Sequence, residues 1–321
     1  MKPSTLPPIL RTTPRVHFKN ILFATDLGSA SAQAQAYAVL LARMFGSHLF
    51  VLHVEAGPGL SPRYQGVSPS PMKEASTAAV PEIAELEMFF RASGVVYTLL
   101  LEHGEVQDAL NRVVDERSID LIILGSHGRH GVSYMFLGST ADNVARSSKR
   151  PVITVGPHAH AGFENMLKTI IFATDFSEES KLALPYATSL AQEFHANLIL
   201  LHVASKRERL VRDREHVERY LLNQLKNLAP HSRFPWCAVS HVVTFGDTAQ
   251  EILNAAKHRN ADLVVLGLHS AVRFTSHLPE RLSYRVLCEA PCPVMSVLSG
   301  VREMKLARLP ADFLVVAPYM N

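Results

Sequence analysis

Short apolar segments alternate with longer amphipathic segments along the first half of the chain. The apolar segments are rich in Val, Ile and Leu, and Leu121–Leu124 carries apolar side chains at consecutive positions. Strands covered on both faces have this composition, and the segments between them have helical spacing. The pattern predicts βαβ units and a parallel sheet. The expected strands are Asn20–Thr25, His48–Val54, Val95–Glu102, Asp120–Gly125 and Pro151–Val155.

The same landmarks return, in the same order, in the second half of the chain. The stretch ILFATDLGSAS at 21–31 returns as IIFATDFSEES at 170–180, and DLIILG at 120–125 returns as DLVVLG at 262–267. The second copy is seven residues shorter between its second strand and the GDTAQEIL stretch that starts at Gly246. This self-similarity indicates a duplication. Each copy is predicted to be a doubly wound, mainly parallel five-stranded α/β domain of Rossmann-like type.

The repeat divides the chain into five predicted segments. Residues 17–156 and 167–299 are the two domains, and residues 157–166 are the linker. Residues 1–16 are expected to be a flexible arm, since they are rich in proline. Residues 300–321 form a tail whose apolar end either covers a groove, pairs along a sheet edge or packs loosely. The Gly-, Pro- and Ser-rich stretch 55–71 is expected to be a mobile loop, either a lid or a plain connector.

Composition narrows the possible classes of function. The 321 residues carry a formal net charge of +3 without a long basic block, so no nucleic-acid partner is expected. The three cysteines form no CxxC pair, which argues against a disulfide framework and a zinc ribbon. No apolar run has the length of a membrane span, and the prolines near the start interrupt any signal peptide. We expect a cytoplasmic protein that does not contact a membrane.

A glycine-rich stretch follows the fourth expected strand, from Gly125 to Thr140. Open α/β sheets bind ligands at the carboxyl ends of their strands, where the strand order reverses. If the first and fourth strands are neighbours, Asp26 and Gly125 face one crevice. Glycines let main-chain N–H groups approach a phosphate, and the helix that starts near Ser139 offers further N–H groups. Arg129 would add a positive charge, and Asp26 would accept hydrogen bonds from ribose hydroxyls or base nitrogen.

Each of these residues also has an ordinary structural interpretation. A glycine after a strand commonly forms a turn, and Ser139 has the composition of a helix cap. His127 and His130 are typical of loop histidines. The spacing of the whole stretch carries more weight than any single residue in it.

That spacing, Gly-x2-Gly-x9-Gly-Ser, resembles the nucleotide-binding members of the universal stress protein family. Asp26, LHV at 52–54, Gly104 and RPVITV at 150–155 also fit, and the resemblance covers both halves of the chain. It implies a tandem member that holds ATP in its first domain, with Mg²⁺ coordinated mainly by phosphate oxygens and water. No metal site made by the protein itself is expected. The implied nucleotide-binding residues are Thr25, Asp26, Val54, Gly125, Ser126, His127, Gly128, Arg129, Gly138, Ser139 and Thr140.

The second copy departs from this motif although its strands and Asp175 remain. The counterparts of Gly128, Gly138 and Ser139 are a serine, a glutamate and an arginine, at positions 270, 280 and 281. Glu280 would place a negative charge where a phosphate would lie. We therefore predict that the second domain does not bind ATP in the same way. As an alternative, a basic pocket for another anion would use Arg273, Arg281, Arg285, His269 and His277.

The expected function is that of a stress-response regulator or sensor rather than an efficient catalyst. Slow ATP hydrolysis and a ligand-free scaffold are the two alternatives. The resemblance also implies that the closing strands at 151–155 and 293–297 pack the two repeats together as an internal pseudo-dimer. Homo-oligomerisation into a dimer, which would hold four domains, and a regulatory protein partner of unknown identity are expected in addition.

Overall fold

A computed structural model describes residues 16–55, 64–67, 81–126, 139–159, 167–204, 214–229, 237–268 and 278–298. The tail 300–321 and residues 1–15 of the predicted arm lie outside the described residues. The first half contains β1 (Asn20–Thr25), α1 (Ser29–Phe45), β2 (His48–Glu55), β3 (Tyr64–Val67), α2 (Pro81–Ser93), β4 (Tyr97–His103), α3 (Val106–Glu116), β5 (Leu121–Gly125), α4 (Ser139–Ser147) and β6 (Val152–Val155). The second half contains β7 (Thr169–Ala173), α5 (Glu178–Phe194), β8 (Asn197–Ala204), α7 (Arg214–Leu228), β9 (Val239–Phe245), α8 (Thr248–His258), β10 (Leu263–Leu268), α9 (Leu278–Glu289) and β11 (Val294–Leu298).

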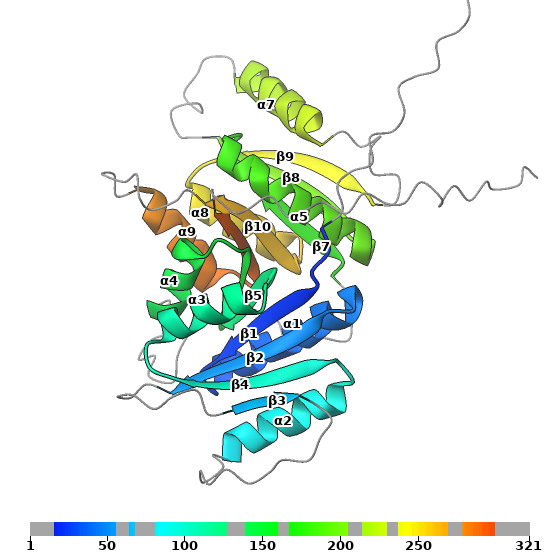
Figure 1. The fold of residues 1–321 in the computed structure, drawn as a ribbon. Coiled ribbons are helices and arrows are strands. Elements are labelled where there is room, and N and C mark those ends of the chain that lie inside the picture. The colour runs from blue at the N-terminus through cyan, green and yellow to red at the C-terminus, as the bar shows by residue number, and fades with distance from the viewer. Residues whose placement is uncertain are drawn as a thin grey trace, which may run out of the picture.

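The described strands join in a single 11-stranded sheet with the order β3-β4-β2-β1-β5-β6-β11-β10-β7-β8-β9 (Figure 1). In the first half β1 lies between β2 and β5 and is parallel to both. In the second half β7 lies in the same way between β8 and β10. The strand order therefore reverses beside β1 and beside β7, which confirms the doubly wound α/β arrangement.

One strand of the sheet, β3, was not expected from the sequence. Residues 64–67 lie within the stretch for which a loop is predicted, but they pair antiparallel with β4 at the edge of the sheet. Their sequence, YQGV, is too short to show an alternating pattern, and glycine weakens strands. Pairing with β4 is what makes this segment a strand. The rest of residues 56–80 lies outside the described residues.

Helices cover both faces of the sheet and create two buried layers. The layer under α1, α2, α5 and α7 contains Phe23, Phe90 and Leu225, and it runs through both halves. The layer under α3, α4, α8 and α9 contains Leu110 and Ile252 and also runs through both halves. Because adjacent residues of a strand point to opposite faces, each central strand supplies side chains to both layers. This explains the consecutive apolar residues in the sequence.

The two halves meet where β6 pairs antiparallel with β11. Thr154 pairs with Val294, Ile153 with Met295, and Val152 with Ser296. These segments are the closing strands that the sequence places at the contact between the repeats. The structure therefore contains the internal pseudo-dimer, and the contact joins the two sheets edge to edge.

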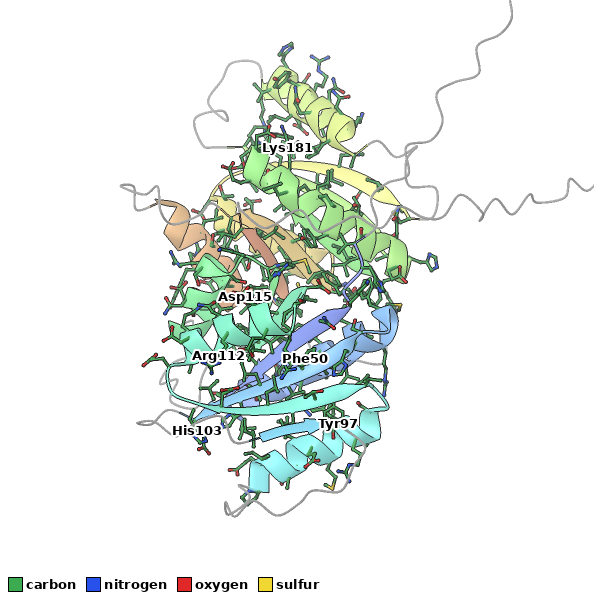
Figure 2. All side chains as sticks on the ribbon, in the orientation of Figure 1. Phe50, Tyr97, His103, Arg112, Asp115 and Lys181 are labelled. Carbon is green, nitrogen blue, oxygen red and sulfur yellow. The ribbon has the colours of Figure 1, made fainter. Side chains whose placement is uncertain are left out.

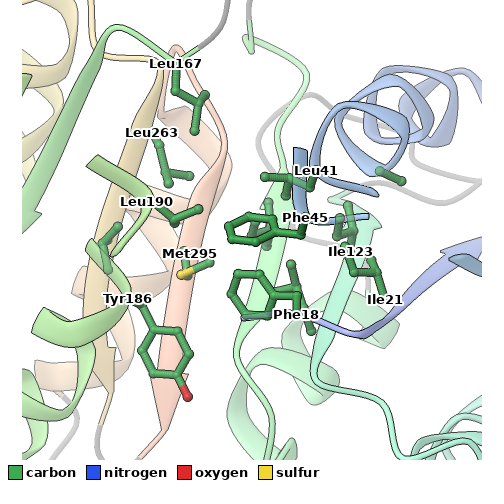
Figure 3. Close-up of a cluster of buried hydrophobic side chains, with 14 of the residues drawn as sticks. Phe18, Ile21, Leu41, Phe45, Ile123, Leu167, Tyr186, Leu190, Leu263 and Met295 are labelled. Atoms are coloured by element: carbon green, nitrogen blue, oxygen red, sulfur yellow. The ribbon is translucent and has the colours of Figure 1, made fainter. Parts of the chain in front are cut away.

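A buried aromatic cluster lies across this contact (Figure 3). Phe18, which precedes β1, is fully buried, and its ring packs edge-on against Phe45 of α1 with centroids 5.0 Å apart. On its other side it faces Tyr186 of α5, with ring centroids 6.3 Å apart and an angle of 18° between the planes. Val16 is also buried, and its N–H group donates a 2.8 Å hydrogen bond to the Ser189 hydroxyl. The segment before β1 is thus held by the second half.

An equivalent tyrosine in each half is influenced by groups of the other half. Burial raises the pKa of Tyr186 to about 12, with Arg150 lowering it and Asp120 raising it. Tyr37 holds the equivalent place in α1, and its pKa is raised by burial and by Cys292 and Asp262. Each of these tyrosines is therefore influenced by charged or titratable groups of the other half, as a pseudo-two-fold arrangement requires.

Candidate functional site

The chain makes a sharp turn directly after β1. Thr25 is buried, and its hydroxyl accepts a 3.0 Å hydrogen bond from the N–H group of Leu27. Leu27 has a positive φ of 65°, a left-handed conformation that residues other than glycine adopt at a cost. This turn leads into α1 and presents the side chain between the two residues, Asp26, at the carboxyl edge of the sheet.

The two oxygens of the Asp26 carboxylate have different surroundings. Oδ1 accepts hydrogen bonds from the N–H group of Gly28 at 3.0 Å and from the Ser31 hydroxyl at 2.5 Å. Oδ2 is buried and has no hydrogen-bond partner among the described residues. A buried carboxylate oxygen without a donor is costly, because water no longer solvates it. The arrangement leaves one strong acceptor available to a bound molecule.

Beside this turn, the end of β2 supplies a histidine and then Val54. The Nδ1 atom of His53 lies 2.9 Å from the carbonyl oxygen of Thr25. Since a carbonyl oxygen only accepts, Nδ1 carries the proton and donates. This hydrogen bond fixes the end of β2 against the turn after β1. Val54 follows as a half-buried residue that packs on the layer under α3.

On the other side of β1, strand β5 ends at Gly125. Ala24 pairs with Leu124, so the ends of the two strands are level. Ser126 follows, is fully buried, and donates its N–H group to the carbonyl oxygen of Val155 at 2.9 Å. The structure thus brings five of the predicted residues to one edge of the sheet at the reversal of strand order. They are Thr25, Asp26, Val54, Gly125 and Ser126.

The remaining predicted residues lie in or after the glycine-rich stretch. His127, Gly128, Arg129 and Gly138 lie outside the described residues. Ser139 begins α4, and Thr140 is exposed in the first turn of that helix. The first-turn N–H groups of α4 have no partner within the helix, as in any helix.

The outer rim of this edge carries a histidine–glutamate contact that sequence reasoning did not identify. Nδ1 of His103 lies 3.2 Å from Oε2 of Glu55, and His103 stands at the end of β4 opposite to Tyr97 (Figure 2). Gly104 follows with a φ of 115°, which favours glycine, and donates its N–H group to the carbonyl oxygen of Glu55 at 3.0 Å. Gly104, which fits the family resemblance, therefore closes the turn beside the contact between His103 and Glu55.

The second half builds the same turn but uses its aspartate differently. Phe176 has the positive φ of Leu27, 65°, and donates its N–H group to the Thr174 hydroxyl at 2.9 Å. Oδ1 of Asp175 accepts from both the N–H group and the hydroxyl of Ser177, at 3.0 and 2.5 Å. Burial raises the pKa of Asp175, but hydrogen bonds from Ser177 and Ser180 outweigh burial and lower it below the usual value. The carboxylate is thus held by its own loop.

Ser180 illustrates the change most directly. It is the counterpart of Ser31 and still helps to lower the pKa of Asp175, but its hydroxyl also bonds to the Thr174 hydroxyl at 2.8 Å and to the carbonyl oxygen of Ser177 at 2.9 Å. Ser177 stands where the first half has Gly28, so its own hydroxyl takes the place of Ser31 at the carboxylate. Ser31 was not predicted as a site residue, although the repeated ATD-x4-S pattern contains a signal for it.

The leading glycine of the second copy has a packing role. A Cβ atom on Gly267 would lie 2.4 Å from Cα of Ser180 and 2.5 Å from the carbonyl oxygen of Glu179. The start of α5 therefore presses directly on the end of β10, and only glycine fits there. This explains why the second copy keeps its first glycine while the later ones are replaced.

The helix after this strand also begins earlier in the second copy. The counterpart of Ser139, the first residue of α4, is position 281, whereas α9 already begins at Leu278. Position 280, the counterpart of Gly138, thus lies inside a helix, so the first-turn N–H groups are moved away from the equivalent place.

The alternative basic pocket of the second domain finds no support at Arg285. Its guanidinium lies 2.9 Å from Asp247 and 3.5 Å from Glu289, and it donates to Gln250 at 3.1 Å. The arginine is therefore neutralised by its neighbours on α8 and α9. His269, Arg273 and His277 lie outside the described residues, as does the side chain of Arg281.

The described residues also bear on metal binding and on membrane insertion. Within the described ranges, no group of three or more His, Cys, Asp or Glu side chains is arranged to hold a metal ion. Every helix in those ranges is too short or too polar to cross a bilayer.

Comparison with known proteins identifies relatives of both halves. A model of the universal stress protein family matches residues 17–156 and 166–297. A universal stress protein of Mycolicibacterium smegmatis is 27% identical over 187 residues, which are 56% of this chain and 62% of that protein, less than two thirds of its length. A universal stress protein of Thermus aquaticus is 31% identical over 138 residues, 41% of this chain and 99% of that protein. The crystal structure of a universal stress protein from Archaeoglobus fulgidus covers 87% of this chain and 98% of its own, with a TM-score of 0.60 and 18% identity, and shares the fold.

Proposed function

The chain belongs to the universal stress protein family as a tandem two-domain member, and we propose that its first domain binds ATP as a regulator or sensor. The single observation that carries this proposal is the unpartnered, buried Oδ2 atom of Asp26. It lies at the reversal of strand order, where open α/β sheets hold ligands. A nucleoside supplies hydroxyl and amino donors that would satisfy such an acceptor.

The neighbours of Asp26 support this role. Gly28 and Ser31 bind Oδ1 and so fix the orientation of the carboxylate, while Oδ2 stays free of protein donors among the described residues. Thr25 holds the turn and His53 holds β2 against it. Val54 would then line the adenosine end, together with Asp26.

The phosphates would be held by the stretch that follows β5. We assign this role to the main chain of Gly125, Ser126, His127, Gly128 and Gly138, with Ser139 and Thr140 at the start of α4 and Arg129 as a cation. N–H groups at a helix start and in a glycine-rich turn favour an anion. Mg²⁺ would be held through phosphate oxygens and water, since hard cations prefer oxygen ligands.

Nucleotide binding at this site is expected to regulate the recognition of a partner protein rather than to support catalysis. A ligand that bridges β1 and the stretch after β5 stabilises one arrangement of that stretch, and a partner protein would recognise the surface so formed. Hydrolysis would require a group that positions water at the γ-phosphate. Asp26 is assigned to the other end of the nucleotide, so we propose no efficient ATPase activity.

Nucleotide release on denaturation tests the proposal. The purified protein is incubated with ATP and Mg²⁺, freed of unbound ligand, denatured, and the supernatant analysed by mass spectrometry. We expect one ATP per chain. ADP that accumulates with time would indicate a slow ATPase, and a complete absence of nucleotide would favour a ligand-free scaffold.

A single substitution that introduces a residue of the second copy into the first tests the assignment of the phosphate site. Gly138→Glu places a carboxylate where the second copy has Glu280 and is expected to abolish ATP binding while far-UV circular dichroism stays unchanged. Unchanged binding in this variant would show that the phosphate assignment is wrong.

A further inference from the structure

The outer face of α2 carries exposed apolar side chains beside charged ones, although the helix already buries another face. Leu86 and Phe90 point into the layer beneath the helix and are 6% and 1% exposed. Met88 and Phe89, one and two residues away, are 68% and 40% exposed. Val96, just after the helix, is 64% exposed. Large apolar side chains that are exposed close together on a folded protein favour an interaction surface.

The exposed residues form an ordered pattern around the helix. With 100° per residue, Ala84, Met88 and Ala92 lie in one stripe along the outer face, and all three are exposed. Phe89 and the exposed Glu85 lie on one side of this stripe. Glu87 and Arg91 lie on the other side, where they form an ion pair of 3.1 Å.

The equivalent helix at the other end of the sheet lacks this pattern. α7 lies at the opposite end of the molecule from α2 (Figure 1). Its buried residues Leu221 and Leu225 match Leu86 and Phe90. The same alignment places exposed asparagines, Asn223 and Asn227, where α2 has Met88 and Ala92. The apolar stripe is thus a feature of one end only.

We propose that α2 is a dimerisation surface that binds the α2 helix of a second copy of this chain. The stripe complements itself when two helices pack antiparallel about a two-fold axis at Met88. Ala84 then lies opposite Ala92 of the second copy, and the two Met88 side chains meet between these small residues. An antiparallel pair closes on itself, so the interface is isologous.

The residues that flank the stripe also face residues of the second copy in this arrangement. A two-fold axis perpendicular to the plane of the two helices places each side of one helix next to the same side of the other. Phe89 therefore meets Phe89 of the second copy, and paired aromatic rings add to the energy of apolar contact. On the opposite side Arg91 lies next to Glu87 of the second copy, so that the two Glu87 carboxylates lie between the two Arg91 guanidinium groups.

The internal contact of the chain leaves this end available. β6 and β11 are already paired with each other, so neither closing strand is a free edge for a second chain. α2 and β3 lie together at the outer end of the first half (Figure 1). A contact through α2 would join two chains end to end and produce the four-domain assembly.

Sedimentation equilibrium tests the proposal by measuring the average molar mass of the protein as a function of its concentration. The wild-type chain is expected to dimerise, and Met88→Glu is expected to raise the dimer Kd by about tenfold or more, because a charge would be buried at the centre of the interface. Asn223→Glu, the matched change on α7, should leave the Kd unchanged. A monomeric wild type, or a Met88→Glu variant that dimerises as well as wild type, would overturn the proposal.

Two further variants test the geometry. Arg91→Glu should weaken the dimer, and Glu87→Arg combined with Arg91→Glu should restore it, because the exchange recreates opposite charges across the two-fold axis. Met88→Cys should form an intermolecular disulfide under mild oxidation, since its two copies meet at that axis, whereas the native Cys237, Cys288 and Cys292 are buried. Failure of both the charge exchange and the cross-link would exclude this antiparallel pairing.

Discussion

The two halves of this chain share a turn and differ in how they use the aspartate within it. In the first half Ser31 and Gly28 hold one carboxylate oxygen of Asp26, and the other oxygen is buried without a partner among the described residues. In the second half Ser177 supplies both a hydroxyl and an N–H group to Asp175. The serine that replaces glycine at this position thus donates its hydroxyl to the second aspartate and also caps the start of α5.

The comparison also separates packing from ligand binding. The turn after the first strand and the glycine at the end of the fourth strand occur in both halves, and both are needed for the fold. The later glycines and the late start of the helix occur in the first half alone. Features confined to one copy of a repeat are the ones to assign to a ligand.

The largest difference in stability is expected at the residue that precedes the first strand of each half. Phe18 and its counterpart Leu167 are both buried, but Phe18 also packs against Phe45 and Tyr186. Phe18→Ala should lower the free energy of unfolding by about 3–5 kcal/mol and Leu167→Ala by about 2 kcal/mol. Urea denaturation followed by circular dichroism measures both values. Equal losses in the two variants would show that the aromatic cluster adds nothing to the contact between the halves.

The next largest difference concerns the two aspartates and ATP. Asp26→Ala removes the proposed acceptor and should weaken ATP binding about 30-fold, the equivalent of about 2 kcal/mol for a hydrogen bond to a charged group. Asp175→Ala should leave the affinity within about twofold of wild type. Isothermal titration calorimetry with ATP and Mg²⁺ measures both. An equal loss in the two variants would place nucleotide in both halves or in neither of these crevices.

Much of the fold was predictable from the sequence, because apolar runs and the repeat specify the strands and their neighbours. The sequence left open whether the first and fourth strands are neighbours, and the pairing of β1 with β5 shows that they are. β3 was not predictable, since YQGV lies in a Gly- and Pro-rich stretch and becomes a strand through its pairing with β4. Long-range pairing of this kind leaves no local signal.

The sequence predicted where five candidate residues lie on the sheet, but it did not predict their hydrogen bonds. The motif and the strand ends identified Thr25, Asp26, Val54, Gly125 and Ser126, which lie at one edge of the sheet. That Ser31 donates to Asp26 depends on the exact geometry of the turn after β1, which the sequence does not specify. The early start of α9 likewise depends on packing.

A smaller effect should distinguish the two tyrosines at the contact between the halves. Burial raises the folded-state pKa of Tyr186 to about 12, against about 10 in the unfolded chain. The neutral phenol therefore contributes stability in full below pH 10, and that contribution is lost as the pH rises towards 12. At pH 11 the loss is about 1.4 kcal/mol.

Phenylalanine variants measure this loss. Tyr186→Phe should flatten the fall in the free energy of unfolding between pH 9 and pH 11, as measured by urea denaturation at each pH. Tyr37→Phe should flatten it at least as much, since Asp262 and Cys292 raise the pKa of Tyr37 whereas Arg150 lowers that of Tyr186. A slope that neither variant changes would mean that the contact does not bury either phenol in solution.

The smallest effect is expected from exchanging the residues that distinguish the two turns. A Cβ atom at Gly28 would lie 3.1 Å from both oxygens of Asp26, so Gly28→Ser would displace the carboxylate and supply the hydroxyl that occupies Asp175 in the second half. ATP affinity should fall about threefold. The N-cap of α1 should meanwhile gain a few tenths of a kcal/mol, because serine caps a helix better than glycine.

The reverse change tests the same idea from the second half. Ser177 caps α5 by accepting from the N–H group of Ser180 at 3.1 Å, so Ser177→Ala should cost about 1 kcal/mol of stability. Ser177→Gly should cost only a few tenths of that and should free the Asp175 carboxylate. The position of α9 still separates the second half from a phosphate site, so neither variant should acquire ATP binding by calorimetry. Binding of ATP by Ser177→Gly would show that the carboxylate alone distinguishes the halves, and that the helix start after the fourth strand does not matter.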